Sequence, residues 1–71
     1  MKVPYNDLQI QWIIIDEEYP ITGICKQQGK LVHFEIDEED QLYVITNLTR
    51  WQELKWALFL YYCRIRERIG L

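Results

Sequence analysis

The sequence lacks serine altogether and holds one histidine, His33, so the usual Ser-His-Asp triad cannot be assembled from it. Its three glycines are isolated from one another, which excludes a glycine-rich phosphate-binding loop. A pocket of substrate size is also difficult to build in 71 residues. We therefore expect a protein that is not an enzyme, with no catalytic residues.

Cysteine is scarce as well. Cys25 and Cys63 lie far apart in the chain without CxxC spacing, and residues 1–9 show no apolar leader. We expect reduced thiols and a cytoplasmic location, with a Cys25–Cys63 disulfide as the alternative. One histidine and two separate cysteines do not supply a tetrahedral ligand set, so neither a metal nor a cofactor is expected.

Long apolar runs are missing too. The longest run is WALFLYYC, residues 56–63, whereas a membrane-spanning helix needs roughly 20 apolar residues. No membrane span is expected. Apolar residues still make up 49% of the chain, which is typical of a folded protein, and we expect a single domain over 1–71.

What is present is a series of short β-type segments. Alternating or continuous apolar residues predict four strands, near 8–15, 21–27, 31–37 and 42–46. Short turns between them favour an antiparallel meander, and Gln28–Gly29 fits a tight two-residue hairpin turn. Gly23 inside the second strand indicates a bulge, a bend or a close backbone approach. We therefore expect a curved sheet, such as an SH3-like half-barrel.

The strands also predict which side chains face inward. The first strand alternates Leu8, Ile10, Trp12 and Ile14 against Gln9, Gln11, Ile13 and Ile15, and its second half is apolar on both faces, as in a central strand. In the third strand the inward residues are Val32, Phe34 and Ile36. In the fourth strand the inward set is Leu42 and Val44, or Tyr43 and Ile45, because a slip of one residue exchanges the two faces.

A C-terminal helix is predicted near 49–69. Thr49 and Gln52 have capping-box spacing, Asn47 is a second candidate cap, and Gly70 is a plausible stop. The fold class is then α+β: a four-stranded antiparallel meander followed by one α-helix packed on the sheet. We expect the helix to cover the sheet with one apolar flank, formed by Trp51, Leu54, Leu58, Tyr61, Tyr62, Ile65 and Ile69.

A second apolar flank of the same helix is left without an evident cover. It consists of Trp56, Phe59, Leu60 and Cys63. Aromatic-rich, charge-poor patches usually mark interaction surfaces, so we predict that these four residues bind a protein partner or a second copy in a homodimer. The alternative is that the fold covers them internally. A membrane-surface helix is disfavoured because the basic cluster follows the patch along the chain.

Charge is distributed unevenly along the chain. Residues 1–47 carry nine acids and three lysines, while residues 48–71 carry five bases and two acids. In a meander, alternate turns lie at one end of the sheet, so seven acidic side chains should converge there. These residues are Asp16, Glu17, Glu18, Asp37, Glu38, Glu39 and Asp40. They form either a solvated end or a docking surface for a basic partner.

The bases gather at the end of the predicted helix. Arg64, Arg66 and Arg68 complement the helix dipole there. Nucleic-acid binding through these arginines is a third hypothesis, but the pI near 5.0 speaks against it.

The functional hypothesis is a small protein-binding module, an adaptor or an inhibitor that acts by occupancy. The size and acidity of the chain suggest a phage- or bacterium-encoded inhibitor of a nucleic-acid-handling enzyme. The alternative is a structural homodimer or assembly subunit with the Trp56 flank as its interface.

Overall fold

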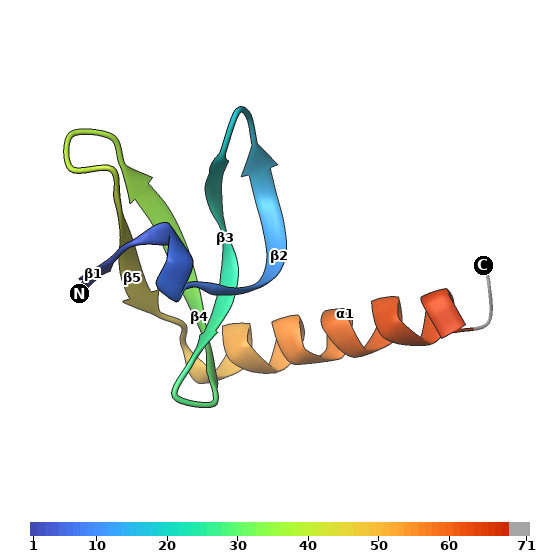
Figure 1. The fold of residues 1–71 in the computed structure, drawn as a ribbon. Helices are drawn as coiled ribbons and strands as arrows, with labels where there is room; N and C mark the ends of the chain where they lie inside the picture. Colours follow the sequence, from blue (N-terminus) through green and yellow to red (C-terminus); the bar gives the residue numbers. More distant parts are fainter. Residues whose placement is uncertain (69–71) are drawn as a thin grey trace.

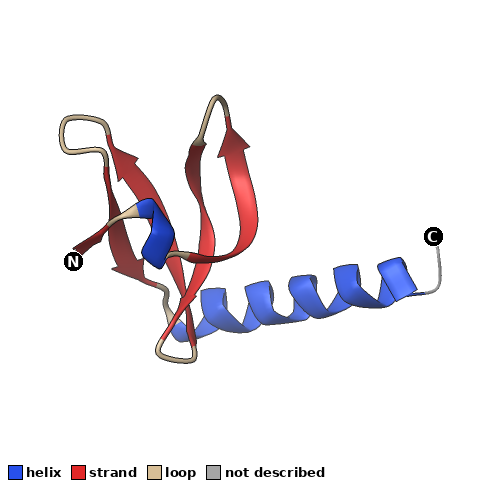
Figure 2. Cartoon of the chain, in the orientation of Figure 1, coloured by secondary structure: helices blue, strands red, loops and turns tan. Residues whose placement is uncertain are grey.

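The computed structural model describes residues 1–68 and shows an α+β fold, an antiparallel sheet followed by one C-terminal helix (Figures 1 and 2). A short 3₁₀ helix, Tyr5–Asp7, follows the first strand. The other elements are the strands β1 (Lys2–Val3), β2 (Gln9–Asp16), β3 (Pro20–Gln27), β4 (Lys30–Asp37) and β5 (Leu42–Asn47), and the helix α1 (Arg50–Arg68).

The sheet has five strands in the order β1-β5-β4-β3-β2, so the expectation of four strands is wrong by one. The meander from β2 to β5 is present as predicted. The additional strand, β1, pairs Lys2 with Val44 and Val3 with Tyr43. Two residues before a proline are too few to show a periodicity in the sequence.

The first strands also close the curve of the sheet. β1 and β2 lie at opposite edges of the sheet, yet only residues 4–8 separate them in the chain. A flat sheet would place these edges about 19 Å apart, and a linker that contains a 3₁₀ turn hardly spans that distance. The sheet therefore curls toward the linker, as Figure 1 shows.

The main core lies on the concave face of this curl. Phe34, Cys25, Val32 and Tyr43 are buried there, and Phe34 is 0% exposed. The predicted inward positions of β4 are thus confirmed, and β5 turns Tyr43 and Ile45 inward. The partly buried residues packed against this cluster are Val3, Leu8, Ile10, Ile36 and Ile45.

The β3–β4 hairpin has the expected two-residue turn. Gln27 pairs with Lys30, and Gln28 and Gly29 have positive φ values of 53° and 79°. Two successive residues with φ above zero are typical of a type I′ turn, whose twist matches that of the strands. This register places Cys25 opposite Val32 and Ile24 opposite His33.

The first long strand, β2, lies at an edge of the sheet, so the central position suggested by its two apolar faces is wrong, and its regular alternation is interrupted. Ile10 pairs with Cys25, but a register shift follows and Trp12 pairs with Ile24. Because opposed residues share a face, Ile10 lies on the core face and Trp12 on the outer, convex face. Gly23, opposite Ile13, lies against the carbonyl oxygen of Trp12, which confirms the close backbone approach.

The helix begins at the predicted capping box. The Thr49 backbone N–H donates to Gln52 Oε1 at 2.9 Å, and the Gln52 N–H donates to Thr49 Oγ1 at 3.2 Å. Asn47, the other candidate cap, belongs to β5. The predicted apolar Ile69 and the predicted stop Gly70 lie outside the described residues.

The expectation about which helix flank faces the sheet is wrong. The described residues of the flank expected to cover the sheet are exposed, whereas Trp56, Leu60 and Cys63 are partly buried. The sheet also offers little area to the helix, which runs along the outer face and projects beyond the strands (Figure 1). No side chain of α1 is fully buried.

Candidate functional site

An aromatic pair joins the helix to the sheet, and a third ring packs on it from within the helix. Trp12 and Phe59 meet edge to face, with ring centroids 4.8 Å apart, and Trp56 meets Phe59 at 5.6 Å in a similar arrangement. Such pairs contribute about 0.5–1.5 kcal/mol beyond the burial of their area. Trp12 reaches the helix only because the register shift turns it to the outer face.

This attachment uses the residues that the sequence suggested for partner binding. Trp56, Leu60 and Cys63 are partly buried against the outer face, and Phe59 remains 39% exposed. Three of the four residues are thus partly covered by the fold itself, which was the alternative to partner binding. Partner binding by these residues stays a prediction, and only the parts of their side chains that remain exposed could take part in it.

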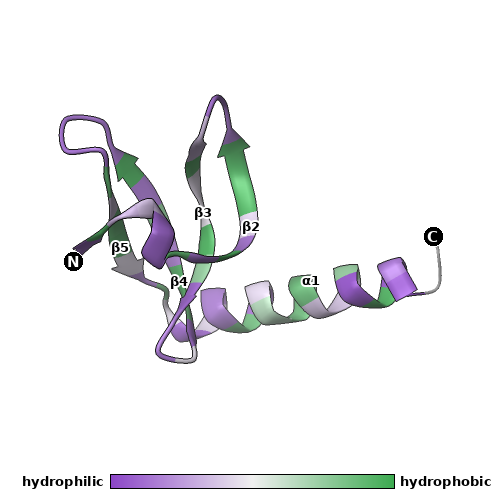
Figure 3. Ribbon diagram, viewed as in Figure 1, coloured by the Kyte–Doolittle hydropathy of each residue, from purple (hydrophilic) through white to green (hydrophobic). Residues whose placement is uncertain are grey.

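The opposite side of the helix is an apolar surface without cover from the described residues. Trp51 is 74% exposed, Leu58 60% and Tyr61 64%. We call this surface the apolar strip; its members are Trp51, Leu54, Leu58, Tyr61, Tyr62 and Ile65. Figure 3 shows apolar residues recurring along the helix where it extends past the sheet. Burying each such side chain would contribute roughly 1.5–3 kcal/mol.

Basic side chains border the apolar strip on both sides. At 100° per residue, Lys55 and Arg66 fall on one side, and the others fall on the opposite side. We call this set the basic rim: Arg50, Lys55, Arg64, Arg66 and Arg68. Arg66 lies over the Tyr62 ring, 5.9 Å from its centroid, and Arg64 donates to Gln11 Oε1 at 3.5 Å.

The two acids of the helix lie farther from the strip, and both share a groove with Arg64. Glu53 lines one groove with Leu31 and Lys26, and Glu67 lines another with Gln11 and Trp12. Glu67 also lines a groove with Ile65 and Arg68. The only salt bridges found in residues 1–68 involve Lys2, so no acid of the described chain pairs with the basic rim. Lys55 and Arg66 therefore border one side of the strip and Arg50 and Arg68 the other, while Arg64 lies between the strip and the two acids.

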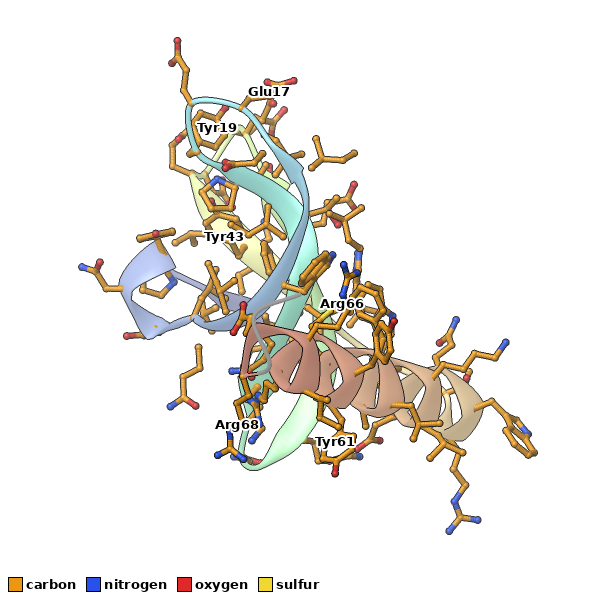
Figure 4. The ribbon with its side chains drawn as sticks, turned by 90° about the vertical axis from the view of Figure 1, so that its right-hand side faces the viewer. Glu17, Tyr19, Tyr43, Tyr61, Arg66 and Arg68 are labelled. Atoms are coloured by element: carbon orange, nitrogen blue, oxygen red, sulfur yellow. The ribbon has the colours of Figure 1, made fainter. Side chains whose placement is uncertain are left out.

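The two predicted acidic turns lie at the same end of the sheet, away from the helix (Figure 1). Figure 4 shows Glu17 at this end and Tyr61 and Arg68 at the opposite one. The seven acidic residues are not all available, however. Lys2 Nζ lies 2.9 Å from Asp37 Oδ2 and 2.6 Å from Asp40 Oδ2. These hydrogen bonds lower the pKa of Asp37 and raise that of Lys2.

The Cys25 thiol and the His33 ring lie on opposite faces of the sheet, so they form no dyad. Burial raises the pKa of Cys25, which disfavours the reactive thiolate. Cys25 and Cys63 are both free, so the alternative disulfide is absent.

His33 forms a hydrogen bond with Thr22 on the outer face. Thr22 Oγ1 lies 2.9 Å from the Phe34 carbonyl, which can only accept, and 2.7 Å from His33 Nε2. Because the Thr22 hydroxyl donates to that carbonyl, His33 Nε2 must be the donor to Oγ1. The hydrogen bond to Thr22 therefore holds the His33 ring in one orientation, with its proton on Nε2.

A buried tyrosine completes the core near the acidic end. Tyr43 Oη donates to the Pro20 carbonyl at 2.7 Å, and its ring packs against Phe34. Burial raises the pKa of Tyr43, with smaller effects of Tyr5, Tyr19 and Asp16. This hydroxyl ties β5 to the start of β3.

Two contributions were missed from the sequence. Regular alternation placed Trp12 on the same side as Ile10, and nothing in the sequence marks the register shift that turns it to the opposite face. Lys2 was not considered, although it is one of only three bases among nine acids in residues 1–47.

No helix among residues 1–68 is both long enough and apolar enough to cross a membrane. Comparison of the chain with protein-family models, with curated proteins and with solved structures gave no match in any of the three. The functional argument therefore depends on the geometry described above.

Proposed function

We propose that this chain is a small, non-enzymatic protein-binding module that acts by occupancy, as an adaptor or an inhibitor. The observation that carries the proposal is the apolar strip, in which Trp51, Leu58 and Tyr61 are all more than half exposed. Contiguous apolar patches of this kind usually mark interaction sites in folded proteins. Aromatic and leucine side chains also make up the cores of known interfaces.

The proposal moves the binding surface from one helix flank to the other. Partner binding was predicted for Trp56, Phe59, Leu60 and Cys63. The exposed parts of these side chains would contribute only to the periphery of the proposed interface. The centre of the interface would be Leu58, because it lies at the middle of the strip and is flanked along the helix by Leu54 and Tyr61. Central, desolvated residues carry most of the energy of an interface.

The acidic end is a proposed second surface. Glu17, Glu18, Glu38 and Glu39 are exposed, and the described residues offer them no basic partner. They could hold a basic partner that otherwise binds phosphates, as an inhibitor of a nucleic-acid-handling enzyme would. The pairing of Asp37 and Asp40 with Lys2 reduces the charge that this end can offer.

A homodimer or assembly subunit is the competing function, since the apolar strip could equally be covered by a second copy. Light scattering on a size-exclusion column over a wide concentration range separates the two. A stable dimer that Leu58→Glu converts to a folded monomer would support the structural role.

Two finer expectations remain proposals. A cytoplasmic location is supported by two free thiols in a chain of this size. An SH3-like half-barrel is supported by the curl of the sheet and by the linker that joins its two edges.

The test of the proposed function is Leu58→Glu. Wild-type protein immobilised through its N-terminus would be used to capture a partner, which is then identified, purified and titrated by calorimetry. We expect Leu58→Glu to weaken binding at least about thirtyfold, equivalent to a hot spot of about 2 kcal/mol. Because Leu58 is exposed, its urea unfolding midpoint should stay close to that of the wild type.

The matched control is a variant of the other surface, Glu17→Gln with Glu38→Gln and Glu39→Gln. Binding that depends on the strip should be nearly unaffected by it. Equal affinity of the wild type and Leu58→Glu would overturn the proposal, and loss of binding in the triple glutamine variant alone would move the function to the acidic end.

A further inference from the structure

We infer that the partner of the apolar strip is an amphipathic helix with acidic side chains on both sides of its own apolar seam. This inference rests on the proposed function and specifies the chemistry of the partner. Three observations carry it: the spacing of the strip residues, the sign of the rim and the orientation of the helix on the sheet.

The spacing is that of a helix-pairing seam. Trp51, Leu54, Leu58, Tyr61 and Ile65 follow one another at intervals of three, four, three and four residues. This is the a/d pattern of heptads, in which side chains of one helix insert between those of a parallel or antiparallel neighbour. The groups that attach α1 to the sheet lie on the other side of the helix.

The orientation of the helix leaves this seam accessible along its length. The seam residues Trp51, Leu58 and Ile65 are exposed from the first to the last turn of α1. The sheet lies on the side of Leu60, and among the seam residues Tyr61 shares a groove with Leu31 of the sheet. Leu58, at the middle of the seam, is 60% exposed and open to a second helix.

The basic rim determines which sign of charge the partner helix should carry. With Trp51 at position a, Arg50 and Arg64 occupy g positions and Lys55 an e position. Charges at e and g meet the flanking charges of the partner helix and decide which helices pair. No acid of residues 1–68 forms a salt bridge with these bases, although Arg64 shares grooves with Glu53 and Glu67. A partner with glutamates or aspartates at its flanks would pair above all with Arg50 and Lys55.

The same positions disfavour a second copy of this chain. In a parallel pair, Arg50 would face Lys55 of the second copy, and in an antiparallel pair Arg50 would face Arg64. Both arrangements bring like charges together at the edges of a short seam. Single-stranded nucleic acid is disfavoured by the net charge of −3 and the pI near 5.0, although Trp51, Tyr61 and Tyr62 offer rings on which bases could stack.

The probes are two synthetic peptides of about three heptads, each with leucine at the a and d positions. One carries glutamate at every e and g position and the other carries lysine there. Fluorescence anisotropy of the labelled peptides is measured against the full chain at low and high salt. We expect the glutamate peptide to bind and the lysine peptide to bind at least about tenfold more weakly, with the difference reduced by salt.

The charge-reversal variant Arg50→Glu, Lys55→Glu, Arg64→Glu provides the matched control. It should exchange the preference, losing the glutamate peptide and gaining the lysine peptide. The rim residues are exposed, so circular dichroism should show a helix content like that of the wild type. Equal binding of both peptides by the wild type, or binding of neither, would overturn the inference.

Three further readouts test the other occupants. Binding to vesicles of phosphatidylglycerol, or to a labelled single-stranded oligonucleotide, more tightly than to the glutamate peptide would overturn the inference in favour of an anionic surface. A wild-type dimer dissociated by Leu58→Glu would overturn it in favour of a second copy. If the captured partner still requires Leu58 while neither peptide binds, only the acidic-helix inference fails. If Leu58→Glu leaves capture intact, the proposed function fails.

Discussion

At the scale of single residues, Gly23 shows how one missing side chain shapes the sheet. The register shift in β2 brings the Trp12 carbonyl oxygen against Gly23, and the Phe34 ring lies on the same site. A Cβ at position 23 would stand 2.8 Å from Phe34 Cζ and closer still to the Trp12 carbonyl. Neither neighbour can yield easily, since one is backbone and the other is a fully buried ring.

We therefore expect Gly23→Ala to lower the free energy of unfolding by about 1–3 kcal/mol or more, through overpacking. Urea titration followed by tryptophan fluorescence measures the change. The control is Gly29→Asn, at a site with open space around it and a φ that asparagine accepts; it should cost much less. An unfolding midpoint for Gly23→Ala equal to that of the wild type would contradict the close packing.

At the scale of elements, the attachment of α1 to the sheet depends on a small number of contacts. The capping box fixes where the helix begins, and its hydrogen bonds satisfy backbone donors of the first turn. The direction of the helix is decided farther along, where Phe59 contacts Trp12. Since α1 makes few other contacts with the strands, this ring pair should contribute measurably to docking.

A double-mutant cycle with Trp12→Leu and Phe59→Leu tests this pair. We expect a coupling energy of about 0.5–1.5 kcal/mol between the two positions, measured from urea unfolding of the wild type, the single variants and the double variant. Trp12→Leu combined with Tyr62→Leu should be additive, because Tyr62 belongs to the exposed strip. Coupling near zero for the Trp12–Phe59 pair would mean that the helix is held by other contacts.

At the scale of the whole molecule, charge and shape separate into two ends. The acidic turns lie at one end of the curled sheet, and the apolar strip with its basic rim lies at the other (Figure 4). At the acidic end, Lys2 of the first strand forms ion pairs with Asp37, the last residue of β4, and with Asp40 in the β4–β5 turn. These ion pairs join residues that are far apart in the sequence, near the two ends of the segment that forms the sheet.

The Lys2–Asp37 pair predicts a pH dependence of stability. The pKa of Asp37 is lowered in the fold, so its stabilisation is fully present above its ordinary value near about 4 and is lost as the pH falls through the lowered value. The pKa of Lys2 is raised in the fold. The stabilisation that Lys2 contributes is therefore fully present below its ordinary value of about 10.4, and it is lost as the pH rises through the raised value.

Lys2→Gln should therefore lower the urea midpoint slightly at pH 7 and low salt, and not at about pH 2 or in 1 M salt. The effect is small because both side chains are largely in water. The control is Lys30→Gln, whose lysine is exposed and has no ion pair among the described residues; its effect should not vary in this way. A difference that persists at pH 2 would contradict the ion-pair explanation.

The sequence by itself determined the features that depend on near neighbours. Alternation predicted the four long strands, the pair Gln28–Gly29 predicted the two-residue turn, and Thr49 with Gln52 predicted the start of the helix. Each depends on backbone preferences or on hydrogen bonds within a few residues.

Only the tertiary structure decided which side of the helix is covered. The two apolar flanks of α1 have similar composition, so amphipathicity could not choose between them. The choice depends on Trp12, which a register shift in β2 turns to the outer face, where it meets Phe59. A shift of one residue in a strand exchanges the two faces of a sheet, and here it accompanies the close packing of the Trp12 carbonyl and the Phe34 ring against Gly23. The exposure of the strip follows from that packing, and so does the surface proposed for binding.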